Sequence, residues 1–223
     1  MNARGEAVDV SPSVPLGIGP LLATFDATGF GMQDPRDLAV RAEALGFDHV
    51  WVGDHLSFRD RPWLESTLAL TAIGTATSRV GLGFSVLLPA LRPYSWAAKQ
   101  IATLQHLFGN RFLLGIGVGG EEPAEWKAAG VPRGERGERT DALLTALPQL
   151  LSGQAVTIDG PGGTEIPPLL PAVGVPPVWV GGRSDAALQR TVRFGDVWLG
   201  AFVDPPGVAT SIARLRELSD EAG

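Results

Sequence analysis

A carboxylate and an imidazole stand side by side just after an apolar run: Asp54 and His55 follow His49–Val52. Such a pair suits general acid–base catalysis, because histidine gains and loses a proton near neutral pH. The same pair is also typical of a structural loop, in which Asp54 caps the next segment and His55 packs against it. From these residues alone the structural interpretation is favoured, and a catalytic His55 is the alternative.

A second candidate is the turn Gly181-Gly182-Arg183-Ser184. Two glycines let the backbone approach a ligand closely, while Ser184 and the first N–H groups of a following helix form an anion site. Arg183 can add a bidentate contact to a phosphate. The alternative is an ordinary strand-to-helix turn in which Ser184 is only the N-cap.

Glycines and acids also follow the apolar run at 112–116: they are Gly117, Gly119, Gly120, Glu121 and Glu122. The glycines remove side chains beside a strand, as the binding of a large flat ring requires, although such loops are common where nothing binds. The acids can supply a general acid, and for at least one of them a solvated acidic loop is the alternative.

These residues stand at the ends of apolar runs that alternate with amphipathic stretches, the pattern of βα units around a parallel sheet. We expect strands over 16–23, 49–52, 80–87, 112–116, 178–180 and 197–201. We expect helices over 35–45, 65–77, 94–107, 136–151 and 208–222, and one more capped by Ser184. In the first helix, Asp34 is the expected N-cap, and Leu38, Ala42 and Leu45 lie on one face. Because ligands bind beyond the carboxyl ends of parallel strands, the candidate residues should share one rim.

The first four expected strands begin at about 16, 49, 80 and 112, close to the ~30 residues of one βα unit. A longer gap before the fifth strand contains 155–158 and the Gly/Pro-rich segment 160–177, which we interpret as a hairpin or loop inserted between units four and five. Six such units fit an α/β fold of either a shortened TIM-type (β/α)8 barrel or an open Rossmann-type sheet. The lack of a G-x-G-x-x-G motif after the first strand favours the barrel.

The amino-acid composition excludes several classes of binding partner. Without cysteine there is no disulfide framework or thiolate zinc site, and we expect no bound metal. A net charge of −6 does not suit nucleic acid or an anionic membrane, and the longest apolar stretch, 80–91, is shorter than the ~20 residues of a membrane span. The first residues lack the basic start and apolar run of a secretory signal. We therefore expect a flexible tail over 1–15 and one cytoplasmic domain over 16–223, with a small-molecule substrate.

Six segments, taken in order, carry a family resemblance: AEALGFDHVWVGDH (42–55), RVGLG (79–83), KQIATL (99–104), GNRFLLGIGVG (109–119), GERGER (134–139) and PVWVGG (177–182). Together they resemble the bacterial luciferase-like monooxygenase superfamily, in particular its branch that uses the deazaflavin coenzyme F420. The resemblance implies a (β/α)8 barrel that binds a flavin or deazaflavin at the carboxyl ends of its strands.

The resemblance also implies roles for particular residues. Asp54 and His55 would lie beside the ring, with His55 handling a proton. A non-prolyl cis peptide would back the ring, here at Ser85-Val86, beside the glycines Gly117 and Gly119. The turn Gly181–Ser184 would hold a phosphate.

The activity that the resemblance implies is hydride transfer between coenzyme F420 and a small organic substrate. With FMN in the same pocket, the alternative is a luciferase-like monooxygenase served by a reductase partner. A catalytically silent flavin-binding protein is a further alternative, because Gly120 stands where sugar-phosphate dehydrogenases of the family carry a catalytic Glu, and Glu121, the candidate acid here, comes one residue later. The family usually has two more βα units after the region of Trp198. Without them strand edges would be exposed, so we expect a homodimer.

Overall fold

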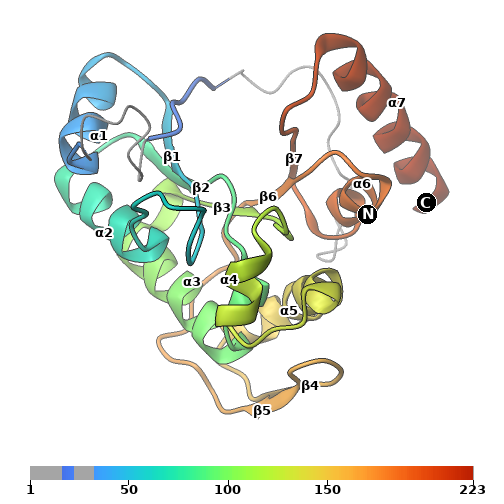
Figure 1. Ribbon diagram of the computed structural model, residues 1–223. Helices are drawn as coiled ribbons and strands as arrows, with labels where there is room; N and C mark the ends of the chain where they lie inside the picture. Colours follow the sequence, from blue (N-terminus) through green and yellow to red (C-terminus); the bar gives the residue numbers. More distant parts are fainter. Residues whose placement is uncertain (1–16, 23–32, 223) are drawn as a thin grey trace.

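Short apolar runs form one parallel sheet in the computed structural model, which describes residues 17–22 and 33–222 (Figure 1). The strands, in their order across the sheet, are β1 (His49–Val52), β2 (Gly81–Phe84), β3 (Phe112–Ile116), β6 (Val178–Gly181) and β7 (Val197–Leu199). The segment 17–22 runs parallel to β1, because the Trp51 N–H donates to the Pro20 carbonyl at 3.0 Å and the Leu22 N–H donates to the Trp51 carbonyl at 2.8 Å. The expected first strand over 16–23 lies partly, and the expected tail over 1–15 wholly, outside the described residues.

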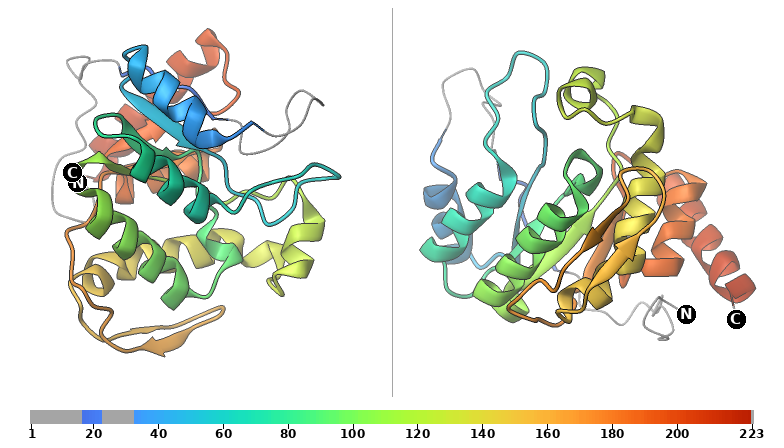
Figure 2. Two further views of the ribbon diagram at one scale, coloured as in Figure 1. Left: turned by 90° about the vertical axis from the view of Figure 1, so that its left-hand side faces the viewer. Right: turned by 90° about the horizontal axis from the view of Figure 1, so that it is seen from below.

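Seven α-helices are described: α1 (Pro35–Ala44), α2 (Ser66–Ala76), α3 (Tyr94–Phe108), α4 (Pro123–Ala128), α5 (Arg136–Leu151), α6 (Asp185–Phe194) and α7 (Pro205–Ala222). The strands follow chain order across the sheet without a reversal, whereas a Rossmann-type sheet reverses at its switch point. Parallel crossovers are right-handed, so connections that all step the same way place their helices on one face. In Figure 2, seen from below, α2, α3 and α5 lie in front of the strands. The strand order therefore favours the barrel-type architecture over the Rossmann type.

One core joins the outer face of the sheet to these helices. Alternate strand residues contribute to it, among them Val50, Val52, Leu82, Phe84, Leu114, Ile116, Val178 and Val180. Helices α1, α2, α3, α5 and α6 cover them with residues such as Ala39, Leu70, Ile101, Leu147 and Phe194. Burial of such apolar side chains is worth roughly 1.5–3 kcal/mol each, which makes this layer the main source of stability.

The inner face of the sheet shows that the sheet is strongly curved. The rings of Trp51 on β1 and Trp179 on β6 lie 5.0 Å apart, centroid to centroid, although β2 and β3 separate their strands. Three strand spacings in a flat sheet would separate them by roughly 14 Å. Gly83 allows the approach, because a Cβ there would lie 2.2 Å from the Trp51 ring. Within the described chain no hydrogen bonds close the sheet between β7 and 17–22, so a closed barrel is not seen, and the count of six units stays a prediction.

Several predicted elements are confirmed and others are shifted. β1, β3 and α5 have the predicted bounds, and Asp34 caps α1 by accepting a hydrogen bond from the Arg36 N–H at 2.9 Å. Leu45 lies just beyond the helix, because α1 ends at Ala44, and its side chain is 69% exposed. β2 is shorter than predicted, since the chain leaves the β1 ladder after Phe84.

Between α5 and β6 the chain forms a separate antiparallel pair, β4 (Val156–Ile158) and β5 (Thr164–Ile166). Its apolar residues pack with Tyr94, Leu143 and Leu150 on the outer side of α3 and α5. Among the described ranges, no helix has the length and apolar character needed to cross a membrane.

Glu43 joins α1 to the start of β2. Its carboxylate accepts hydrogen bonds from the backbone N–H groups of Ser78, Arg79 and Val80, the last two at 2.7 Å each. These bonds, that of Val80 first, favour the ionised form and lower the pKa of Glu43 from 4.5 to about 2.

We expect Glu43→Gln to lower the free energy of unfolding near pH 7 by about 1–2 kcal/mol, because bonds to a charged acceptor are replaced by weaker ones. Since the pKa is depressed by folding, the wild-type contribution is complete above about pH 4.5 and is lost as the pH falls toward 2. Urea unfolding between pH 7 and 2 measures this. Glu165→Gln, an exposed acid on β5, is the matched control, and an equal loss in both variants would contradict the assignment.

Candidate active site

Four strand ends meet on one rim, because β1, β2, β3 and β6 are parallel neighbours in register. The candidate residues on this rim are Asp54, His55, Ser85, Val86, Gly117, Gly119, Gly181, Gly182, Arg183 and Ser184. The loop after β1 and helix α4 project from this same end of the sheet (Figure 2).

His55 is held by an acid that the sequence did not indicate. Its Nδ1 lies 3.1 and 3.0 Å from the two carboxylate oxygens of Glu125 on α4, and the Leu56 N–H donates to the same carboxylate at 3.2 Å. Glu125 is 0% exposed. Because an ionised carboxylate only accepts hydrogen bonds, this contact places a proton on Nδ1 and leaves Nε2 to exchange a proton with a ligand.

Two aromatic rings pack against the imidazole of His55. The Phe58 ring lies 4.6 Å and the Trp63 ring 4.8 Å from it, the latter edge-on. Among the described residues Nε2 has no hydrogen-bond partner. The imidazole is therefore fixed at one nitrogen, screened on its sides, and available at the other.

Asp54 is committed to other protein groups. It accepts hydrogen bonds from Ser66 Oγ at 2.6 Å and from the Leu88 N–H at 2.8 Å, and it forms a bidentate ion pair with Arg92 at 2.7 and 2.8 Å. Burial lowers the pKa of Arg92, but the hydrogen bond and charge of Asp54 outweigh burial and raise it overall. With its carboxylate occupied in this way, Asp54 positions the neighbouring His55.

Val86 occupies the space that the rim glycines leave. The peptide bond Ser85-Val86 is cis, as the family resemblance implied. A Cβ on Gly117 or on Gly181 would lie 2.5 Å from a methyl group of Val86, and one on Gly119 would lie 2.8 Å from Leu88. The structure thus brings Val86, Gly117 and Gly181 together. The glycines make room for the side chains of Val86 and Leu88, which pack against the backbone at this end of the sheet.

The turn after β6, the expected anion site, leads directly into α6. Gly182 has a φ of +130°, which glycine adopts without the cost paid by other residues, and its N–H donates to Leu199. Ser184 caps the ten-residue helix α6 by accepting from the Ala187 N–H at 3.3 Å. Arg183 is exposed and donates to the Phe202 carbonyl at 3.1 Å.

The candidate acid Glu121 directly follows Gly120 in the loop after β3. It is exposed and makes no hydrogen bond or ion pair within the described ranges, whereas Glu122 caps α4. Pro123 is a helix-start signal that could have placed Glu125 on a helix. Nothing in the spacing linked Glu125 to a histidine 70 residues earlier. No cluster of three or more metal-ligating side chains occurs among the described residues.

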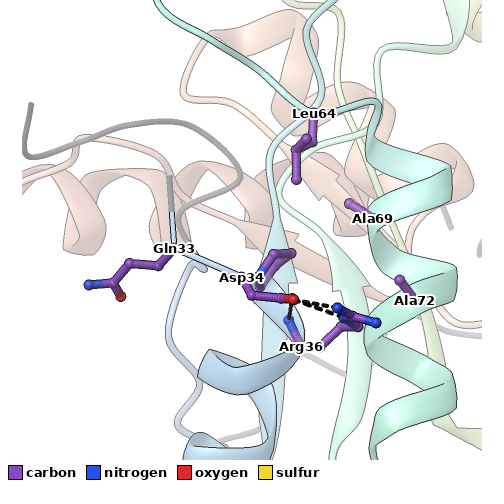
Figure 3. A pocket seen from close by; sticks show the side chains of 7 residues that line it. Gln33, Asp34, Arg36, Leu64, Ala69 and Ala72 are labelled. Carbon is purple, nitrogen blue, oxygen red and sulfur yellow. Dashed lines mark hydrogen bonds and ion pairs between the residues drawn. The ribbon is translucent and has the colours of Figure 1, made fainter. Parts of the chain in front are cut away.

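A hollow between α1 and α2 does not belong to this site (Figure 3). It is lined by Gln33, Asp34, Pro35, Arg36, Leu64, Ala69 and Ala72. Its two charged side chains, Asp34 and Arg36, are already paired with each other. The rim around His55 is therefore the better candidate.

We expect Asp54→Asn to destabilise the protein by about 1–3 kcal/mol, because the partly buried Arg92 loses its bidentate carboxylate and keeps only the longer ion pair with Glu65 at 3.3 Å. Thermal or urea unfolding measures this. Asp60→Asn is the control, since Asp60 is exposed in the same loop. Equal stability of the two variants would show that the hydrogen bonds and ion pair of the Asp54 carboxylate do not stabilise the fold.

Comparison with known proteins agrees with this architecture. The profile of the luciferase-like monooxygenase family matches residues 20–223. An uncharacterized protein of Mycobacterium tuberculosis is 33% identical over 209 residues, covering 92% of this chain and 72% of that protein. The F420-dependent glucose-6-phosphate dehydrogenase of Nakamurella multipartita is 31% identical over 212 residues, covering 88% of this chain and 61% of that enzyme.

Solved structures share the fold. An F420-dependent secondary alcohol dehydrogenase in complex with an F420-acetone adduct matches with a TM-score of 0.79 at 22% identity, covering 93% of this chain and 64% of that one. The oxygenating constituent of 3,6-diketocamphane monooxygenase from Pseudomonas putida, in complex with FMN, matches with a TM-score of 0.73 at 18% identity, covering 93% and 62%. The chain thus spans less than two thirds of either structure. From the profile match and the 33% identity to the mycobacterial protein, this chain belongs to the luciferase-like monooxygenase family.

Proposed function

We propose that the protein is an oxidoreductase that transfers a hydride between coenzyme F420 and a small organic substrate. The observation that carries this proposal is the imidazole of His55 on the carboxyl rim, fixed at Nδ1 by the buried Glu125 and without a partner at Nε2 in the part of the chain that the structure describes. Relatives named as F420-dependent glucose-6-phosphate dehydrogenases support F420 as the cofactor. When bound, F420 supplies or accepts the hydride at its deazaflavin ring.

The rim residues fit such a cofactor. Val86, seated between Gly117 and Gly181, presents an apolar surface against which a flat ring can lie. The turn Gly182–Ser184 presents N–H groups at the start of α6, together with the exposed guanidinium of Arg183, as a phosphate requires.

The part of the chemistry that falls to this chain is proton transfer. As a hydride reaches a substrate carbonyl carbon, His55 Nε2 donates the proton that the oxygen needs, and in the opposite direction it removes that proton from an alcohol. Glu125 holds the proton at Nδ1 and stabilises the charged imidazole. Phe58 and Trp63 exclude water from the sides of the ring.

Cofactor titration, followed by quenching of Trp fluorescence, tests the proposal first. We expect F420 to bind far more tightly than FMN. We expect Arg183→Gln to weaken F420 binding by about tenfold, because it removes a charge-assisted contact to phosphate. Arg216→Gln on α7 makes the same charge change at another exposed arginine and should bind normally. Preference for FMN would favour the monooxygenase, and binding of neither cofactor would overturn the proposal.

Turnover tests the proton-handling residues. We expect His55→Ala to lower kcat by ~10²–10⁴-fold with little change in cofactor affinity. Glu125→Gln should lower kcat by about tenfold or more, because an amide does not hold one imidazole tautomer. The assay follows the F420 absorbance over a panel of small alcohols, ketones and sugar phosphates. If Glu121→Gln abolishes turnover and Glu125→Gln does not, the acid expected from the sequence is the functional one.

The homodimer and the reductase partner stay predictions. In the silent-binder alternative, F420 would bind without turnover of any substrate in the panel, and His55→Ala would change neither measurement.

A further inference from the structure

Two arginines beside Gly120 have no carboxylate partner. Arg133, just before α5, donates from Nε to the Gly120 carbonyl at 2.9 Å. Arg136, the first residue of α5, donates from Nη1 to the Arg133 carbonyl at 2.8 Å. Neither forms an ion pair within the described part of the chain. Both positive charges therefore lie uncompensated at one place, next to the loop that follows β3.

The bidentate edge of Arg136 is free. Its Nε is buried and has no hydrogen-bond partner among the described residues. Elsewhere in the chain the same edge, Nε together with Nη2, holds a carboxylate: Arg190 binds Asp141 at 2.5 and 3.0 Å in this way. A buried donor without an acceptor is costly, so the free edge of Arg136 indicates an acceptor that comes from outside the chain.

Both guanidinium groups lie against Gly120. A Cβ on Gly120 would lie 2.9 Å from Arg136 Nε and 3.5 Å from Arg133 Nε, so both guanidinium groups approach the same side of this residue. The φ of Gly120 is +119°, which disfavours other residues. A side chain at residue 120 would therefore displace Arg136 from its position.

Within the described ranges no neighbouring acid forms an ion pair with either arginine, including Glu121, the exposed residue that follows Gly120. Glu135 is bound to Arg139 at 3.0 Å, and Glu122 accepts from the backbone N–H groups of Ala124 and Arg59. Arg136 also opens a 16-residue helix, whose amino end already carries partial positive charge, so a cation there is unfavourable for the helix itself. An anionic ligand would pair with the two guanidinium groups and would also offset the unfavourable position of the Arg136 charge at the amino end of α5.

We propose that Arg136 and Arg133 form a subsite for a carboxylate or phosphate group beside Gly120. Glu125, which holds His55, belongs to the same connection between β3 and α5. For the proposed function the subsite therefore indicates an anionic substrate, and this assignment rests on that function. The anion is carried either by the substrate or by the cofactor, and the experiment below separates the two sources.

Inorganic phosphate is the first probe, because its binding requires neither cofactor nor substrate. The full chain is titrated while the ¹⁵N–¹H signals of arginine Nε groups are recorded, with the Arg136 signal identified by its loss in Arg136→Lys. We expect a saturable shift of the Arg136 signal and none of the Arg216 signal. An unshifted Arg136 signal, or equal non-saturating shifts of both signals, would overturn the proposal.

Variants give the second measurement. We expect Arg136→Gln to weaken phosphate binding by about tenfold or more. Arg136→Lys should also weaken it, because an ammonium lacks the two-pronged edge. Arg216→Gln should bind phosphate as the wild type does. An equal loss of phosphate affinity in this variant would show that the effect comes from net charge alone and would contradict the subsite. If melting curves show that the Arg136 variants are unfolded, Arg133→Gln replaces them, with a weakening of several-fold expected.

Titration of the same variants with F420 and with FMN identifies the source of the anion. If Arg136→Gln weakens cofactor and phosphate binding alike, the cofactor supplies the anion and the assignment of an anionic substrate falls. If it weakens phosphate binding alone, the substrate supplies the anion. Phosphate binding without binding of either cofactor would refute the proposed function and leave the anion subsite standing. Cofactor binding without phosphate binding would refute the anion subsite and leave the proposed function standing.

Discussion

Four hydrogen-bond donors converge on the buried carboxylate of Asp54 at the end of β1. They come from the start of α2, from the backbone after β2 and from the guanidinium of Arg92. A buried charge is tolerated only when it is paired and its lone pairs are used, and here both conditions hold. Because His55 is the next residue, the ion pair that fixes Asp54 also fixes the backbone from which the imidazole projects.

The curvature of the sheet has a similar role on a larger scale. The rings of Trp51 and Trp179 meet across the inner face only because glycine occupies the intervening strands at positions such as Gly83. The same curvature brings the end of β2 toward the ends of β3 and β6, so that Val86 packs against Gly117 and Gly181. Small residues on the inner face thus determine how closely the strand ends approach one another.

The rim has two chemically different parts. One part, from β1 and α4, holds an imidazole whose free nitrogen can exchange a proton, and its acid is buried so that the contact is protected from water. The other part consists of cationic groups that have no carboxylate partner among the described residues, at the turn before α6 and at the start of α5. A ligand with an anionic group and a reactive carbonyl or alcohol would satisfy both parts.

The sequence by itself determined the alternation of strands and helices, the bounds of β1, β3 and α5, and the caps Asp34 and Ser184, because these follow from local apolar periodicity and local hydrogen bonding. It also placed the candidate residues after the strand ends. Only the tertiary structure decided between barrel-type and Rossmann-type strand order, since both have the same local pattern. It also placed Glu125 against His55 and left Arg136 Nε without a partner among the described residues. Those contacts join residues far apart in the chain, and no periodicity or spacing encodes which distant side chains meet.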